Sequence, residues 1–164
     1  MKKLIAALAA LAVMALAPAT ALGAKGGTDR PAKAAFSGTT VVTPTGPTSS
    51  DIAFTGTGRI AHGGKSTLES SGTSAFTSMT TFDFSASSTV TVANGDQLFT
   101  TETGTGKINA DGSVVIDITS TTTGGTGRFE GASGSSTGTI SNVPSSDPAV
   151  TYDTTVSTSG TISY

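Results

Sequence analysis

Short segments in which apolar and polar residues alternate follow one another from Phe36 to the end of the chain. In Ser113–Thr122, valine and isoleucine occupy positions 114, 116 and 118, whereas positions 117 and 119 are polar. This period of two is typical of a half-buried β-strand. Threonine and serine fill many of the other positions, and the branched Cβ of threonine suits a pleated sheet. The pattern predicts an all-β fold, with no helix after Ala24.

Turn signals separate these segments. Asn94-Gly95 lies between two apolar runs, and Asn109–Gly112 is a second turn of this kind, so both predict tight hairpins. The strands are expected over Phe36–Thr43, Asp51–Ile60, Ser66–Ser70, Ala75–Phe84, Ser88–Val92, Gln97–Thr105, Ser113–Thr122, Ser136–Asn142 and Val150–Tyr164. Strands joined by hairpins form an antiparallel meander, and closure into a barrel removes its two edges. We therefore predict a single antiparallel β-barrel of about eight strands, with a β-sandwich as the alternative.

The first residues have the pattern of an export signal. Lys2 and Lys3 precede the apolar run Leu4–Leu16, and small residues follow at Ala19–Ala21. This arrangement predicts a helical signal peptide over residues 1–21, with cleavage as late as residue 24. The apolar run is shorter than the roughly 20 residues that span a bilayer, so we expect no permanent membrane anchor. We expect secretion or a periplasmic location, a flexible leader over residues 22–34, and the barrel domain over 35–164.

Composition narrows the chemistry. The chain has no cysteine, which excludes disulfides, thiol catalysis and a lipid anchor on an N-terminal cysteine. Its formal charge is −2, and loss of Lys2 and Lys3 would make it −4, so we expect no nucleic-acid partner. We also expect no cofactor and no metal site, since a lone histidine without cysteines cannot form an ordinary zinc site. The sequence makes no prediction of oligomeric state.

One segment, Thr123–Gly134, contains five glycines around a single large apolar side chain. Its structural motif consists of Gly124, Gly125, Gly127, Phe129, Gly131 and Gly134. Glycine permits positive φ and close backbone approach, so the segment predicts a bent strand at a barrel corner. A phosphate loop would need a following helix and a lysine, and Glu130–Ser136 provides neither.

This segment resembles the T-G-G-[ST]-G-x-F-E-G-x-x-G stretch of the allene oxide cyclase family and the related motif of plant dirigent proteins. The resemblance implies an eight-stranded antiparallel barrel of the calycin type. A longer likeness, to small exported bacterial proteins of unassigned function, includes Gly56–Gly58, Ala61-His62, Ala93–Asp96 and Gly160–Tyr164. Allene oxide cyclases bind an apolar oxylipin and use a glutamate, with a cysteine lining the cavity. That cysteine is missing here, and Glu130 matches the motif's own glutamate rather than the catalytic one.

Few residues are candidates for catalysis or ligand binding. His62, the only histidine, lies in a glycine-rich turn near Arg59 and could bind a ligand, although a solvated turn residue is the favoured interpretation. Arg128 and Glu130 flank Phe129 and would share the opposite face of an extended strand, as a charged pair at a barrel mouth or on the surface. No Gly-x-Ser-x-Gly elbow is present between a strand and a helix, so we identify no catalytic residue.

Three mid-strand carboxylates, Asp83, Glu102 and Asp117, are expected to point outward. An inward-facing one would need partners, because burying an unpaired carboxylate is costly.

The sequence leaves two main hypotheses for the function. The sequence favours a non-enzymatic exported barrel with a structural or interaction role at the cell envelope or outside the cell. The alternative is a binder of a small apolar ligand, with or without an isomerase activity like that of allene oxide cyclase. Its candidate ligand-binding residues are His62, Arg59, Phe54, Phe99, Arg128 and Glu130. Phenylalanines 54, 76, 82, 84, 99 and 129 could line a cavity or fill it, since an eight-stranded barrel is just wide enough for either. Ice binding is a third idea, which the irregular threonine spacing does not favour.

Overall fold

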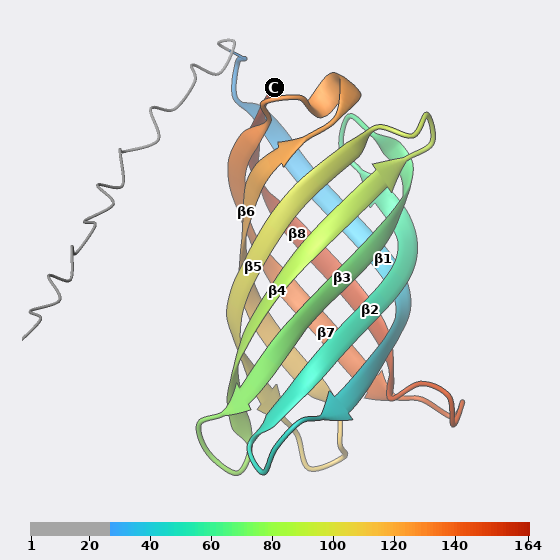
Figure 1. The fold of residues 1–164 in the computed structure, drawn as a ribbon, viewed down its shortest axis with the longest axis vertical. Coiled ribbons are helices and arrows are strands. Elements are labelled where there is room, and N and C mark those ends of the chain that lie inside the picture. Colours follow the sequence, from blue (N-terminus) through green and yellow to red (C-terminus); the bar gives the residue numbers. More distant parts are fainter. Residues whose placement is uncertain (1–26) are drawn as a thin grey trace, which may run out of the picture.

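The computed structural model describes residues 27–164, which form a closed barrel of eight antiparallel strands (Figure 1). Each strand pairs with the next along the chain, and the last closes on the first. The strands are β1 Arg30–Pro44, β2 Ser49–Ile60, β3 Gly64–Phe76, β4 Thr81–Val92, β5 Gln97–Ile108, β6 Val114–Gly125, β7 Ser133–Pro144 and β8 Tyr152–Ser163. In the described part of the chain, the one helix is the 3-10 turn η1, Gly127–Phe129. The predicted all-β meander barrel is confirmed, whereas the signal peptide lies outside the described residues.

The first strand begins earlier than predicted. Arg30–Ala34 belongs to β1 and not to a flexible leader, because its backbone pairs with β8, with Arg30 opposite Ile162 and Ala34 opposite Thr158. Of the rest of the predicted leader, residues 27–29 are described and belong to no strand, and residues 22–26 lie outside the part that the structure describes. Pairing with β8 closes the barrel, so this edge cannot be recognised from local sequence alone.

The boundary between β3 and β4 also differs from the prediction. The segment Ala75–Phe84 is not one strand, since the chain turns between Phe76 and Thr81. This turn contains no glycine or proline. The Ser78 hydroxyl instead accepts hydrogen bonds from the backbone N–H groups of Thr80 and Thr81, at 3.2 and 3.1 Å. Serine hydroxyls mimic a backbone turn in this way, and their sequence signal is weak.

Side chains alternate between the barrel interior and solvent along the strands, and the inward positions hold most of the large apolar residues. Two buried clusters result. One contains Phe36, Phe54, Ile60, Leu68, Val90, Val92, Leu98, Phe129, Ala132 and Ile162. The other contains Phe82, Phe84, Val114, Ile116 and Ile118. Some inward positions require glycine: a Cβ on Gly138 would overlap the carbonyl oxygen of Ser157 on the neighbouring strand, so a larger residue would push the two strands apart.

The glycine-rich segment closes one end of the barrel. We predicted a bent strand for this segment, and the structure has one at Gly124. The register between β5 and β6 shifts there, between Phe99 and Thr100, which is a β-bulge. Beyond Gly125 the chain leaves the sheet, forms η1 and turns Phe129 into the barrel, where this side chain is 1% exposed. The Tyr164 ring packs edge-on against Phe129, with ring centroids 5.3 Å apart. We call this end, at the top of Figure 1, the plug end.

Candidate ligand-binding site inside the barrel

The barrel interior is not completely filled. A cavity of about 270 Å³ extends from Ala61, near the plug end, to Phe76 at the opposite end, and inward-facing residues of all eight strands line it. A dry cavity of about 150 Å³ can hold benzene, and typical ligand pockets begin at about 300 Å³. The space is therefore large enough for a small organic molecule and exceeds an ordinary packing defect.

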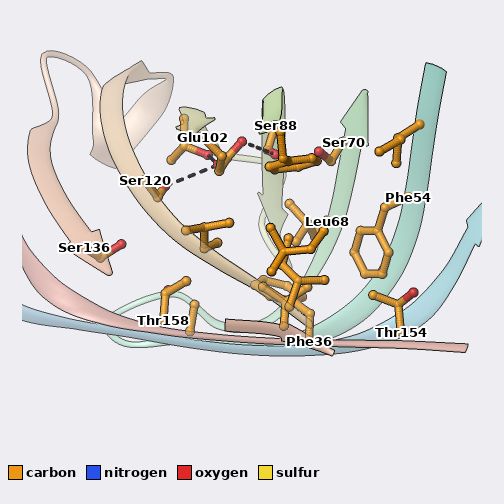
Figure 2. A pocket seen from close by; sticks show the side chains of 18 of the residues that line it. Phe36, Phe54, Leu68, Ser70, Ser88, Glu102, Ser120, Ser136, Thr154 and Thr158 are labelled. Atoms are coloured by element: carbon orange, nitrogen blue, oxygen red, sulfur yellow. Dashed lines mark hydrogen bonds between the residues drawn. The ribbon is translucent and has the colours of Figure 1, made fainter. Parts of the chain in front are cut away.

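One carboxylate lines this cavity. Glu102, in the middle of β5, is 8% exposed and points inward from the barrel wall (Figure 2). Ser88 of β4 donates a hydrogen bond to its Oε2 atom at 2.9 Å, and Ser120 of β6 donates to Oε1 at 3.2 Å. Thr100 of the same strand also donates to Oε1. Three hydroxyl groups thus offset part of the cost of removing this carboxylate from water.

The prediction that Glu102 faces solvent is wrong. Its position is in phase with Leu98 and Ile108, which face inward, and with glycines 104 and 106. The outward positions of β5 hold Thr101, threonines 103 and 105, and a lysine at 107. Asp83 and Asp117 are exposed as predicted.

The hydrogen bonds leave Glu102 with unused capacity. A carboxylate offers about four acceptor positions, two on each oxygen. Oε1 accepts from Thr100 and Ser120, whereas Oε2 accepts from Ser88 alone. The remaining position on Oε2 is available for one more donor. Ser70 and Ser136 extend the row of hydroxyl groups on either side, since they pair across the sheet with Ser88 and Ser120.

A second polar group lines the cavity nearer the opposite end. Thr154 of β8 donates a hydrogen bond to the Asn142 Oδ1 atom of β7 at 2.7 Å. Because that hydroxyl has a single proton, the 2.7 Å contact between Thr40 and Thr154 has Thr40 as its donor. All three residues are buried and line the cavity. The interior therefore combines apolar walls with two separate groups of hydrogen-bonding side chains.

The predicted ligand-binding residues divide between the interior and the surface. Phe54 is buried and lines the cavity, as do the phenylalanines at positions 82, 84 and 129, and Phe76 lines it while remaining 38% exposed. Phe99 does not line it, because odd-numbered positions of β5 face outward. Arg59 and Glu130 are exposed and lie outside the cavity lining. Phe36 lines the cavity although it was not a predicted site residue; its phase with Ala32 and Ala34 could have indicated this.

His62 and Arg128 belong to the plug end and not to the cavity. His62 occupies the β2–β3 turn with φ of 65°, and its Nε2 atom lies 3.1 Å from the carbonyl oxygen of Pro31. Arg128 does not pair with Glu130, because η1 is not extended. Its Nε atom pairs with Asp96 at 3.1 Å, and its Nη1 donates to the His62 carbonyl oxygen at 3.1 Å.

Arg128 therefore joins three connections, β2–β3, β4–β5 and β6–β7, beside the Phe129 plug. Hydrogen bonds from the Asn94 side chain, then from the Arg128 backbone and guanidinium, lower the pKa of Asp96. Gly127 is required here, because its φ is 56° and a Cβ would overlap the Asp96 carboxylate.

Within residues 27–164, no group of three or more histidine, cysteine or acidic side chains could hold a metal ion. No helix in this range is long and apolar enough to cross a bilayer. No protein-family model, curated protein or solved structure matches the chain. The eight-stranded antiparallel barrel is compatible with a calycin-like fold.

Proposed function

We propose that the protein binds a small, mainly apolar molecule inside the barrel and holds its polar group at Glu102. The observation that carries this proposal is the coincidence of a cavity of about 270 Å³ with a buried carboxylate that retains an acceptor position. Ligand sites typically combine apolar walls with a few converging polar groups. Burying a carboxylate beside apolar walls costs free energy that its three hydroxyl partners offset only in part, so its presence here favours a binding role over a purely structural one.

The chemistry of the site indicates the class of ligand. The free position on Oε2 of Glu102 accepts a hydrogen bond, so a hydroxyl or amine group fits it better than an ester or ether. The apolar walls contributed by Phe36, Phe54 and Leu68 suit a ring or a short hydrocarbon chain. The proposed ligand is therefore a compact apolar alcohol, phenol or amine.

Two naphthalene derivatives test this specificity. 2-Naphthol has a hydroxyl donor, whereas 2-methoxynaphthalene has nearly the same apolar surface but no donor. Calorimetry should show 2-naphthol binding about ten-fold to a hundred-fold more tightly, since a hydrogen bond to a charged group contributes about 1.5–3 kcal/mol. Glu102→Leu should abolish this preference. The matched control is Glu69→Leu on the outer face of β3, which should keep it.

Filling the cavity provides an independent test. Ser136 lines the cavity, whereas its neighbour Ser135 is exposed on the outside of β7. Ser136→Leu should weaken binding of both probes, and Ser135→Leu should not. Equal affinities for the two naphthalenes, or equal effects of the two serine substitutions, would contradict the proposal.

Glu102 also favours a second candidate, an isomerase related to the allene oxide cyclase and dirigent families in which this carboxylate moves a proton on an apolar substrate. The glycine motif and the eight-stranded barrel support this relationship. Turnover of an unsaturated oxylipin epoxide that is lost in Glu102→Gln, with binding retained, would establish it. Absence of turnover in the unmodified protein would leave binding as the function.

A further inference from the structure

Charge is distributed unevenly along the barrel. Of the six lysines and arginines in residues 27–164, the plug end carries Arg30, Lys33, Arg59, Lys65 and Arg128. The opposite end carries one, Lys107 on β5, among the carboxylates Asp51, Asp83, Asp111, Asp117, Asp147 and Asp153. The plug end also carries the carboxylates Asp29, Asp96 and Glu130, so cations outnumber carboxylates there by five to three, whereas carboxylates outnumber the cation by six to one at the opposite end.

Three of these cations form a cluster on the outer face of β1, β2 and β3. Arg59 lies directly opposite Lys65 in the sheet register. Ala35 is opposite Arg59, so Lys33 is one diagonal step away from that arginine. All three side chains are exposed. We call Lys33, Arg59 and Lys65 the basic cluster.

The basic cluster has no carboxylate to neutralise it within the described residues. The one ion pair there joins Arg128 to Asp96. Glu69, on the same face of β3, is four residues beyond Lys65, about 13 Å along the strand. Like charges directly opposite in a sheet destabilise it, and threonine or serine occupies most comparable outward positions of this barrel. An anionic partner would relieve this repulsion.

The surroundings of the cluster indicate what kind of partner fits. Apart from Ala35, its paired neighbours on the outer wall carry hydroxyl groups: Lys33 pairs with Ser159, Ala35 pairs with Ser157, and Thr57 pairs with Thr67. The exposed large apolar side chains Val41, Phe76, Met79, Val115 and Val143 all lie toward the opposite end. Peripheral membrane binding normally combines basic residues with apolar side chains that enter the lipid. A basic surface surrounded by hydroxyl groups suits a hydrated, hydroxyl-rich polyanion better than a bilayer.

We propose that the basic cluster docks the protein onto an acidic polysaccharide. The cations pair with the carboxylate or sulfate groups of the polymer, and the adjacent serine and threonine hydroxyls hydrogen-bond to its sugar rings. The three side chains are exposed on the outside of the barrel wall, and only Lys33 also borders the cavity, at its plug end. Arg59 and Lys65 lie outside the cavity lining, so binding of an acidic polymer can be measured separately from binding of the naphthalene probes.

The test measures binding of the full chain to immobilised polygalacturonate and dextran sulfate, with uncharged dextran as the reference. The triple variant Lys33→Ser, Arg59→Ser, Lys65→Ser should bind the acidic polymers about ten-fold less tightly or worse, because three ion pairs are lost. The control variant Lys107→Ser removes one cation from the opposite end and should stay within about two-fold. Binding of the unmodified protein should weaken steeply with added salt.

Folding of the triple variant is checked by thermal unfolding. Its midpoint should equal or exceed that of the unmodified protein, since the substitutions remove repulsion. Unchanged binding by the triple variant, or equal binding to uncharged dextran, would overturn the proposal. Tighter binding to vesicles of phosphatidylglycerol and phosphatidylcholine, or pairing of two copies of the chain at low salt that needs the cluster, would also overturn it.

Discussion

Replacing the plug residue should destabilise the whole barrel. Phe129 is the most completely buried large side chain, at 1% exposure, and its ring packs edge-on against Tyr164. Phe129→Ala therefore removes a full aromatic side chain and one aromatic pair. Core substitutions of this type cost about 3–5 kcal/mol. The barrel wall cannot collapse easily into the space, so we expect about 4 kcal/mol, which corresponds to a decrease of about 10–15 °C in the unfolding midpoint.

The assay is urea unfolding followed by circular dichroism, with thermal unfolding as a second measurement. Met79→Ala is the control, because Met79 is 96% exposed and its substitution should change stability by less than about 0.5 kcal/mol. Phe129→Leu should lie between the two. A Phe129→Ala variant within about 1 kcal/mol of the unmodified protein would refute the interpretation of this residue as the plug that closes the barrel.

Three further predictions concern other parts of the molecule. The pKa of Asp96 is lowered in the folded state, so the Asp96 carboxylate stabilises the fold above its unfolded pKa of about 3.9, and this stabilisation is lost as pH falls through the lower folded pKa. Asp96→Asn should therefore reduce the loss of thermal stability below about pH 4. An acid unfolding profile that the substitution does not change would contradict this. Gly138→Ala should lower the free energy of unfolding in urea by about 1–3 kcal/mol, because its Cβ would overlap the Ser157 carbonyl oxygen. Ser135→Ala, on the exposed face of the same strand, is the control and should be nearly neutral. Equal effects of the two substitutions would show that the strands can move apart at little cost. His62→Ala should leave 2-naphthol affinity unchanged in calorimetry, since His62 lies outside the cavity lining. A large loss of affinity would show that His62 contributes to ligand binding.

Local sequence predicted the strands where apolar residues mark one face. Residues 114, 116 and 118 of β6 specify where the strand begins and which of its faces points inward, whereas its end at Gly125 lies three residues beyond the predicted end at Thr122. The same reasoning was insufficient near Ser78, because serine and threonine occupy both faces and a side-chain hydroxyl makes the turn. It was also insufficient at Arg30, whose strand partner is far away in the sequence, at Ile162. Pairings of this kind depend on barrel closure, which no single segment encodes.

The candidate site was harder to predict than the fold. Phe99 is apolar yet faces outward, and Glu102 is charged yet faces inward, so residue type alone gave the wrong side for both. The positions of Leu98 and Ile108 indicate that even-numbered residues of β5 face inward, which correctly places Glu102 inside and Phe99 outside. The Arg128–Asp96 pair could not be predicted, since it joins residues 32 positions apart through the fold of the glycine-rich segment. The cavity volume likewise depends on how side chains of all eight strands meet.

Native mass spectrometry of the protein isolated from its natural source tests the central proposal most directly. If the interior is a ligand site, the folded protein should carry a reproducible adduct of about 100–300 Da, the size that a cavity of about 270 Å³ can hold, and should release it on unfolding. A protein that shows only its bare mass in every preparation, under conditions that preserve the fold, would contradict ligand binding and favour a purely structural barrel.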